Sequence, residues 1–315
     1  MASWLRALTL ALGLGLAVGT NAATAATAAV RPVVVSSKLS SESAMIGQMI
    51  RRLLQANGIP TVDRTTLGGT PVVRRALLAG EIDLYVEYTG NAGFFFNRPD
   101  DPAWKDWRRG YELGARLDRE HHGIVWLAPA PASNAWALAV RRDVARRHRL
   151  ATLSDFARWV RDGGDIVLAC SAEFANAGTL RSLERTYGFR LEPRQKIVLA
   201  GGETAATIAA AAARTNDINT AMVYGTDGGI AAADLVLLED DRHDQPVYAP
   251  VPTARAAVVS AYPGLPALVR PLMQRLDTAT LQALNARVQI DGESPEAVAV
   301  DFLQAAGLLT AGSRR

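Results

Sequence analysis

The stretch LGGTPVVRRALLAGEIDLYVEYTGNAG, residues 67–93, holds the local signals that decide the fold. Two glycines form a turn. Thr70 then suits a helix N-cap, and Pro71 suits the first helical position, where its missing N–H costs nothing. The spacing predicts a short helix over residues 72–78 that ends at the next glycine in the left-handed conformation. Residues 82–88 are predicted to form a strand that runs into a second turn.

The carboxyl end of this strand is the first candidate ligand site. In an open parallel sheet, ligands lie just beyond the carboxyl ends of the strands. The strand ends in Tyr88-Thr89-Gly90-Asn91, so Tyr88 and Asn91 are placed where a small molecule would be held.

The residues before this stretch predict that its strand joins a parallel sheet. Val33-Val34-Val35 has the composition of a short buried strand, and a second strand is predicted at residues 62–66. Between them, apolar residues at helical spacing predict a helix packed on the core: Met45, Ile46, Met49, Ile50, Leu53 and Leu54. The resulting β-α-β-α-β order implies parallel pairing and right-handed crossovers.

A proline-bearing break at residues 128–134 separates two predicted strands and is a candidate hinge between two α/β lobes. Further strands are predicted at 166–169, 197–199, 218–224 and 235–238, a return to the first lobe at 247–251, and closing helices near 263–276 and 295–307. We therefore expect a signal peptide at 1–28, a discontinuous first lobe at 29–131 and 229–315, and a second lobe at 132–228.

The amino terminus and the composition restrict the class of protein. The expected signal peptide has an apolar segment too short to span a bilayer, followed by small residues that suit signal peptidase. The remaining chain is expected to be a soluble exported protein. Its net charge of +3 is small and interspersed, which predicts no nucleic-acid binding. No motif of a phosphate loop, zinc protease or serine hydrolase is present, so we expect no enzyme activity, cofactor or metal.

Five side chains at strand ends form the best candidate site. Lys38, Tyr88, Asn91, Trp136 and Tyr224 all fall at or just beyond predicted strand ends. A quaternary ammonium cannot donate a strong N–H hydrogen bond, so its recognition relies on the electron-rich faces of aromatic rings. Two or three rings with one lysine therefore predict a ligand that places a cation on the rings and a carboxylate on the lysine.

Several segments resemble the osmoprotectant-binding proteins of ABC importers, which bind glycine betaine, choline, carnitine or related quaternary amines. The segments are VSSK at 35–38, LGGTPVV at 67–73, GEIDLYVEYTG at 80–90 and YGTDG at 224–228. The resemblance continues to the C-terminal part and covers nearly the whole mature chain. It implies a type II periplasmic-binding-protein fold, in which two α/β lobes joined by a two-segment hinge hold the ligand in the cleft between them.

The same resemblance implies roles for the candidate residues. Lys38 would face the ligand's carboxylate, Tyr88 and Tyr224 would be walls of a cation cage, and Trp136 would take the place of a cage tyrosine. It also implies a periplasmic location and a partner permease of an ABC importer in the inner membrane, and we expect the protein to be a monomer.

Three positions depart from the family's pattern. Asn91 stands where the family often has threonine, Ala177 stands where it often has an arginine that clamps the carboxylate, and the sequence around Ala205 lacks an aromatic residue often seen there. Loss of a guanidinium removes a strong charge-assisted contact. These differences favour a choline-like ligand without a carboxylate, another small cation or low affinity over tight glycine betaine binding.

Three other functions stay open from the sequence. The same fold could bind an amino acid or another small polar solute, which would call for a fixed acidic group to hold an α-ammonium. The protein could also sense an osmolyte for a partner without feeding a permease. The third alternative is a secreted enzyme on a two-lobed scaffold, against which the lack of a nucleophile–base pair argues.

Overall fold

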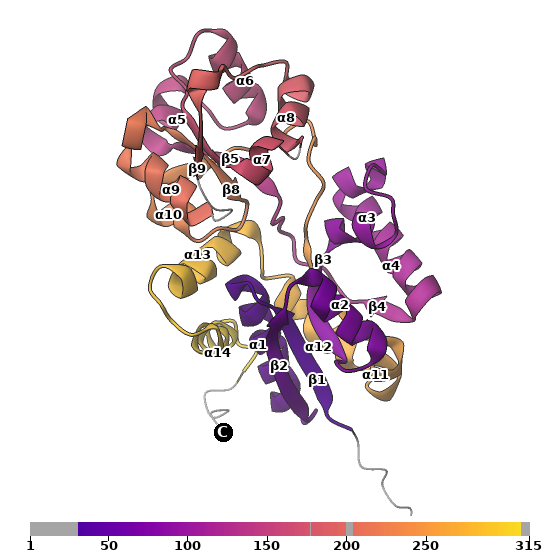
Figure 1. The fold of residues 1–315 in the computed structure, drawn as a ribbon. Helices are drawn as coiled ribbons and strands as arrows, with labels where there is room; N and C mark the ends of the chain where they lie inside the picture. The colour runs from indigo at the N-terminus through magenta and orange to yellow at the C-terminus, as the bar shows by residue number, and fades with distance from the viewer. Residues whose placement is uncertain (1–30, 177, 200–203, 310–315) are drawn as a thin grey trace, which may run out of the picture. The chain divides into compact units, whose positions relative to one another are not determined.

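Two α/β lobes, each built on its own five-stranded sheet, form the described part of the computed structural model of the chain (Figure 1). The structure describes residues 31–176, 178–199 and 204–309. The predicted signal peptide at residues 1–28 lies outside these described residues. Among the described helices, none is both long and apolar enough to cross a membrane.

The first sheet has the strand order β2-β1-β3-β10-β4. Its strands are β1 (Val33–Lys38), β2 (Thr61–Gly68), β3 (Leu84–Tyr88), β4 (Ile124–Trp126) and β10 (Pro250–Arg255). β1 pairs in parallel with β2 and β3, as the β-α-β-α-β order predicts, and β10 inserts antiparallel between β3 and β4. Because β1 and β3 run in parallel, their carboxyl ends meet at one edge of the sheet.

Residues 67–93 fold nearly as predicted. Helix α2 (Thr70–Ala79) begins two residues before the predicted range, with Pro71 in its first turn. Its N-cap is Gly69, so the prediction of Thr70 as the cap is wrong: Thr70 is the first helical residue. It ends at Gly80, whose φ of 77° is the left-handed conformation that favours glycine. β3 follows and is buried along its whole length, which fits its central place in the sheet.

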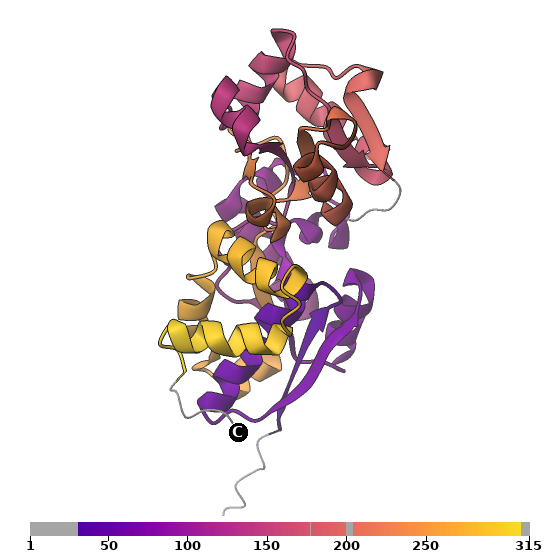
Figure 2. The same ribbon diagram turned by 90° about the vertical axis from the view of Figure 1, so that its left-hand side faces the viewer.

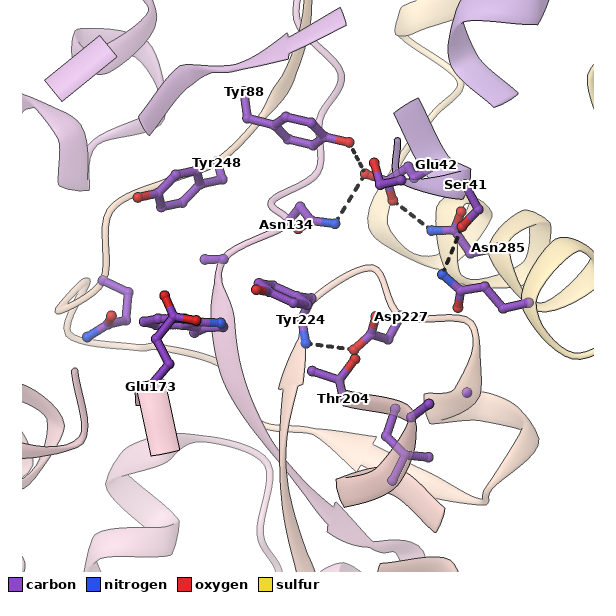
Figure 3. A pocket seen from close by; sticks show the side chains of 18 of the residues that line it. Ser41, Glu42, Tyr88, Asn134, Glu173, Thr204, Tyr224, Asp227, Tyr248 and Asn285 are labelled. Atoms are coloured by element: carbon purple, nitrogen blue, oxygen red, sulfur yellow. Dashed lines mark hydrogen bonds between the residues drawn. The ribbon is translucent and has the colours of Figure 1, made fainter. Parts of the chain in front are cut away.

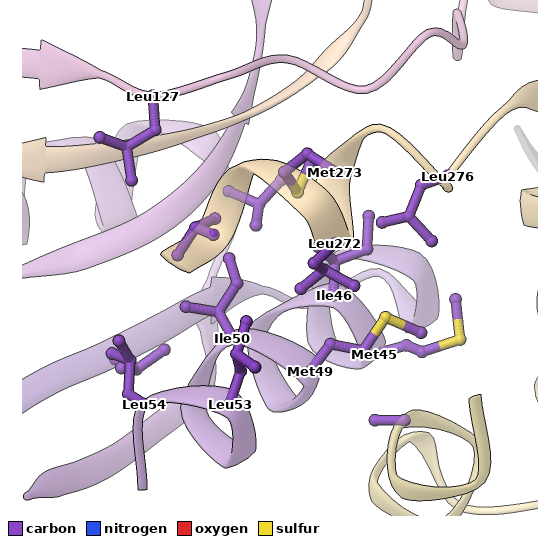
Figure 4. Packing of buried hydrophobic residues seen from close by; sticks show 14 of the residues in the cluster. Met45, Ile46, Met49, Ile50, Leu53, Leu54, Leu127, Leu272, Met273 and Leu276 are labelled. Carbon is purple, nitrogen blue, oxygen red and sulfur yellow. The ribbon is translucent and has the colours of Figure 1, made fainter. Parts of the chain in front are cut away.

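Helix α1 (Ser41–Ala56) lies at the centre of the first lobe's core. It packs against α12 (Leu265–Met273), α13 (Thr278–Gln289) and α14 (Pro295–Ala305), and Figure 2 shows α13 and α14 in yellow beside it. The apolar face predicted for this helix is buried, as Figure 4 shows: Met45, Ile46, Met49, Ile50, Leu53 and Leu54. Burial of each such side chain contributes roughly 1.5–3 kcal/mol, so core packing explains the two methionines of α1.

The rest of the first lobe surrounds its sheet. Its remaining helices are α3 (Ala92–Phe95), α4 (Trp107–His122) and α11 (Ala256–Ala261), with 3-10 turns at η1 (Thr89–Asn91) and η2 (Pro102–Lys105). α4 packs on β4, and α11 extends directly from β10.

The second sheet has the strand order β7-β6-β8-β5-β9. Its strands are β5 (Trp136–Arg141), β6 (Leu168–Ser171), β7 (Lys196–Leu199), β8 (Thr220–Tyr224) and β9 (Leu235–Leu237). The helices are α5 (Arg142–His148), α6 (Leu153–Arg161), α7 (Ala172–Asn176), α8 (Thr179–Tyr187), α9 (Thr204–Ala213) and α10 (Gly229–Ala232), with 3-10 turns η3 (Pro193–Gln195) and η4 (Thr215–Asp217). β6 is parallel to β7 and β8, whereas β5 is antiparallel to β8 and β9.

The boundary predicted between residues 228 and 229 is wrong. β9 pairs with β5 through Leu237 opposite Ala139 and Leu235 opposite Arg141, so the chain is still in the second lobe at residue 237. It returns to the first lobe between β9 and β10. The first crossing lies between β4 and β5 and contains the predicted proline-bearing break. The order of two lobes joined by two crossings is therefore as expected, with the second crossing later than predicted.

Helix α13 of the C-terminal segment lies directly against the turn that follows β8. A Cβ atom on Gly228 would lie 2.2 Å from the backbone nitrogen of Ala286, so only glycine fits this close approach. Along one face of α13, Gln282 donates to the Gly225 carbonyl at 2.8 Å and Asn285 donates to the Thr226 carbonyl at 2.7 Å. The YGTDG segment and the following helix α10 are therefore where the second lobe contacts α13 of the first.

Candidate ligand-binding site

A pocket of about 1200 Å³ lies between the two lobes. The first lobe and the crossings line it with residues that include Ser41, Glu42, Tyr88, Asn91, Phe94, Asn134, Tyr248 and Asn285. The second lobe lines it with residues that include Trp136, Glu173, Thr204, Ala205, Tyr224 and Asp227. Figure 3 shows tyrosine rings from both lobes arranged around this space.

The Tyr-Thr-Gly-Asn turn after β3 builds the first wall of the pocket. Tyr88 lines the pocket, and its hydroxyl points away from its own strand toward α1 (Figure 3). Thr89 accepts a hydrogen bond from the Ala249 N–H at 3.0 Å and pins the second crossing to β3. Gly90 makes room for the ring of Tyr248, since a Cβ there would lie 2.8 Å from that ring. The motif therefore places Tyr88 on the pocket directly, and it places Tyr248 there by leaving space for its ring at Gly90.

Trp136 and Tyr224 build the opposite wall on the second lobe. They face each other as a register pair on β5 and β8, and their rings stack with centroids 6.3 Å apart and planes at 29°. Phe174 supports the indole from the side in an edge contact at 5.8 Å. The indole Nε1 is buried and has no hydrogen-bond partner among the described residues.

Glu42 places a buried carboxylate on the pocket, and sequence reasoning missed it. It belongs to the first turn of α1 and is only 3% exposed. Tyr88 Oη and Asn134 Nδ2 donate to its Oε1 at 2.8 and 3.2 Å, and Asn285 Nδ2 donates to its Oε2 at 2.6 Å (Figure 3). Burial raises the pKa of Glu42 above its ordinary value, and these hydrogen bonds oppose that shift without cancelling it.

The charged side chains in the described pocket lining are all acidic. Three carboxylates line the pocket, those of Glu42, Glu173 and Asp227, and no lysine, arginine or histidine is among the described lining residues. Residues 177 and 200–203 lie outside the described part of the chain, and the sequence places no basic residue at any of them. Among the described residues, no group of His, Cys, Asp and Glu is arranged to hold a metal ion.

Lys38 is the predicted site residue that the structure keeps away from the described lining of the pocket. Its side chain is buried, and its ammonium donates to Glu87 Oε1. Glu87 also accepts from the Tyr85 hydroxyl and from Asn91 Nδ2, each at 2.7 Å. The charge of Lys38 is thus already used within the first lobe, which argues against the expected contact with a ligand carboxylate.

The other four predicted residues, Tyr88, Asn91, Trp136 and Tyr224, all line the pocket. Ala205 lines it too, whereas Ala177 lies outside the described residues. Beside Glu42, sequence reasoning missed Asn134, Tyr248, Glu173, Asp227 and Asn285. Asn134 and Tyr248 lie in the two crossings. The predicted hinge is the only signal in the sequence that could have placed them near the ligand.

Comparison with known proteins agrees with this architecture. The family model described as the substrate binding domain of ABC-type glycine betaine transport system matches residues 31–305. The glycine betaine-binding protein YehZ of Escherichia coli (strain K12) is 46% identical over 280 residues, which cover 89% of this chain and 92% of that protein. A glycine-betaine-binding protein of Pseudomonas aeruginosa is 30% identical over 285 residues, which cover 88% of this chain and 89% of that protein.

A solved structure supports the same assignment at the level of the fold. Apo YehZ from Escherichia coli matches with a TM-score of 0.84 and covers 88% of this chain and 99% of its own. The type II periplasmic-binding-protein fold expected from the sequence is therefore confirmed. The chain belongs to the family of substrate-binding domains of ABC-type glycine betaine transport systems.

Proposed function

We propose that this protein binds a quaternary or otherwise alkylated ammonium solute between its lobes and delivers it to the permease of an ABC importer. The observation that carries the proposal is the composition of the pocket wall. Tyr88 and Tyr248 from one side and Trp136 and Tyr224 from the other surround a space that also contains the Glu42 carboxylate.

The rings supply the attraction that a methylated ammonium needs. Such a cation has no strong N–H donor, and each ring face within about 6 Å contributes roughly 0.5–2 kcal/mol. The contribution is larger when closing lobes remove water from the site. The relatives named above are glycine betaine-binding proteins, which supports the same chemical class for this chain.

The protein's work is a change of shape, with no covalent chemistry. A ligand that contacts both walls favours the arrangement in which the lobes lie close together, because only there do both sets of contacts form. Thr89 holds residues 247–249 at the end of the second crossing against β3, so movement of the lobes would bend the remaining backbone of the two crossings. The closed, loaded form would then be the one that the permease recognises.

The expected signal peptide supports a periplasmic location, and the family supports an ABC permease in the inner membrane as partner. We further propose that the protein acts as a monomer and not as an enzyme. The matching family model describes a substrate binding domain, which supports a binding role without catalysis.

A second candidate ligand is an amino acid, and Glu42 is the observation that favours it. An α-ammonium would find a fixed buried carboxylate there. The α-carboxylate, however, would find no cationic side chain among the described lining residues, and an α-ammonium gains less from ring faces than from hydrogen-bond acceptors. The wall composition therefore favours the alkylated ammonium.

Isothermal titration calorimetry of the mature protein with choline, glycine betaine, carnitine, proline betaine and a panel of amino acids tests the proposal. We expect at least one alkylated ammonium to bind, and Trp136→Ala to weaken that binding. Trp107→Ala is the matched control, because Trp107 is exposed and outside the described lining. Binding of an amino acid alone, or no binding of any methylated amine by folded protein, would contradict the proposed ligand class.

A further inference from the structure

We infer that Glu42 is the counter-ion of the bound cation and makes the pocket prefer a cation without a carboxylate, of which choline is the simplest hydroxylated example, over a zwitterion such as glycine betaine. This inference rests on the proposed function, because it assigns the ligand's charge at that same site. It also assigns a specificity-determining role to a residue outside the aromatic walls.

The first step is the electrostatic state of Glu42. Its hydrogen-bond partners, the side chains of Tyr88, Asn134, Thr226 and Asn285, are all neutral. No described lysine, arginine or histidine forms an ion pair with it. A buried carboxylate is costly unless it is paired with a cation. Glu42 lies on the wall of a pocket, so the cation that it lacks can be supplied by a ligand.

The second step is the position of Glu42 relative to the rings. The Tyr88 hydroxyl donates to Glu42 while the Tyr88 ring lines the pocket, so carboxylate and ring face the same space (Figure 3). Asn134, in the first crossing, donates to Glu42 from between the lobes. A cation seated on the Tyr88 ring therefore lies close to Glu42.

The third step is what a ligand carboxylate would meet. The described lining offers it Glu42, Glu173 and Asp227 and no cationic side chain. Lys38, the nearest buried ammonium to the Tyr88 ring at 4.8 Å from its centroid, is neutralised by Glu87. A zwitterion would thus bring a negative charge into an acidic pocket that contains no compensating side chain, whereas a simple cation would not.

The fourth step concerns the ligand's uncharged end. The described lining includes neutral polar side chains, among them Ser41 and Thr204. A ligand hydroxyl can exchange hydrogen bonds with such groups without adding charge to the acidic lining. A cation that carries a hydroxyl therefore fits this lining better than a cation that carries a carboxylate.

The test measures affinities of the mature protein at neutral pH for three probes by calorimetry. They are choline, glycine betaine and 3,3-dimethyl-1-butanol, the uncharged isostere in which carbon replaces the nitrogen of choline. We expect choline to bind at least about tenfold more tightly than either of the other two, which corresponds to about 1.4 kcal/mol. This comparison uses only the wild-type chain and so does not depend on a variant that folds.

Variants then assign the preference to Glu42. Glu42→Gln is expected to weaken choline binding at least about tenfold and to leave glycine betaine unchanged or improved, so that the preference collapses. Glu81→Gln is the matched control, because it removes an exposed carboxylate of the first lobe outside the described lining, and it should change choline affinity less than about threefold.

The outcomes separate this inference from the proposed function. Glycine betaine binding as tightly as choline overturns the inference alone, and would point to the helix N-termini at Ser41 and Thr204 as holders of the carboxylate. Equal loss of both ligands in folded Glu42→Gln protein also overturns it. No binding of any methylated amine overturns the proposed function, and the inference falls with it.

Discussion

Glu42 and Glu87 both bury a carboxylate beside Tyr88, and they differ in what neutralises them. Glu87 accepts from the Tyr88 backbone N–H at 2.7 Å and is paired with the Lys38 ammonium. Glu42 accepts from the side chains of Tyr88 and Thr226 and from two amides, without a described cationic partner. The carboxylate of Glu87 is thus neutralised by the fold itself, whereas the carboxylate of Glu42 faces the pocket.

A structural charge in this protein is neutralised within one lobe, whereas Glu42 lies where the lobes meet. The Lys38–Glu87 pair lies between neighbouring strands of one sheet and is complete without a ligand. The hydrogen bonds of Glu42 come from β3, from the first crossing and from α13, and Asn285 on α13 also donates to Thr226 of the second lobe. Glu42 therefore lies where a ligand and the junction of the lobes meet.

The largest expected effect is the loss of free energy of unfolding when the Lys38–Glu87 ion pair is broken. Lys38→Met should destabilise the protein by about 3–5 kcal/mol, because it leaves the buried Glu87 without its cation. Urea denaturation measures this change. Lys105→Met is the matched control, because Lys105 is exposed and its contact with Asp244 at 3.6 Å should contribute less than about 1 kcal/mol. A Lys38→Met protein of wild-type stability that had lost ligand binding would restore the role first expected for this lysine.

The next largest effect is on ligand binding at the second-lobe wall formed by Trp136 and Tyr224. Trp136→Ala should weaken choline binding by about 0.5–2 kcal/mol, or roughly 2- to 30-fold, because one ring face of the cage is lost. Trp136→Phe should lose less, since a ring face remains while the indole donor is removed. Calorimetry on both variants separates the ring from the donor. Equal choline affinities of the wild type, Trp136→Ala and Trp136→Phe would exclude Trp136 from the site.

The pH dependence of choline binding should be moderate and should rise with pH. Burial raises the pKa of Glu42 above the ordinary value of 4.5, and the cation binds the ionised form. Affinity should therefore increase as pH rises through the raised pKa and then level off, with proton release on binding in that window. Of the groups that donate to Glu42, only Tyr88 titrates, and burial raises its pKa well above 10, so it stays neutral. A pH-independent affinity in wild type, identical to that of Glu42→Gln, would contradict this account.

The smallest effect is on the stability of the unliganded protein. The folded state holds the Glu42 proton more tightly than the unfolded state, so this residue favours folding at low pH and loses that advantage as pH rises from 4.5 through the raised pKa. Wild type should thus lose stability relative to Glu42→Gln over that range, and at neutral pH the two should differ by no more than about 1 kcal/mol. Denaturation curves of both proteins at several pH values measure the difference. A large loss in Glu42→Gln at neutral pH would make Glu42 a structural charge like Glu87.

Local signals in the sequence predicted local structure well. Pro71 and Gly80 mark the two ends of α2 because helix ends depend on a few neighbouring residues. Tyr88 and Tyr224 were placed on the pocket by one general rule, that ligands lie beyond the carboxyl ends of strands. Trp136 is at the amino end of β5 and reaches the same edge because β5 runs antiparallel to β8. The parallel pairing of β1 with β2 and β3 likewise followed from the alternation of strands and helices in the first lobe.

Features that depend on long-range pairing were not predictable in the same way. β9 could have belonged to either lobe, and only its pairing with β5 settles the second boundary. Glu42 looked like an ordinary acidic residue in the first turn of a helix, where negative charge is commonly favourable. Its contact with Tyr88 exists only once β1, α1 and β3 are assembled.

The pairing of Lys38 with Glu87 has a cause in the register of the sheet. Ser36 on β1 lies opposite Tyr85 on β3, so a step of two residues along each parallel strand brings Lys38 opposite Glu87. A glutamate in the middle of an apolar strand calls for a buried partner, and the lysine at the end of the neighbouring strand was available to supply it. That signal was present in the sequence once the register was known.

The most direct measurement is a crystal structure of the protein with bound choline. The account predicts that the choline nitrogen lies within about 6 Å of the ring centroids of Tyr88 and at least one ring of the second lobe. It also predicts that the nitrogen lies within about 4–6 Å of the Glu42 carboxylate, with Lys38 still paired to Glu87. A choline nitrogen seated against Glu173 and away from Glu42, or a ligand oxygen bound by a released Lys38, would contradict it.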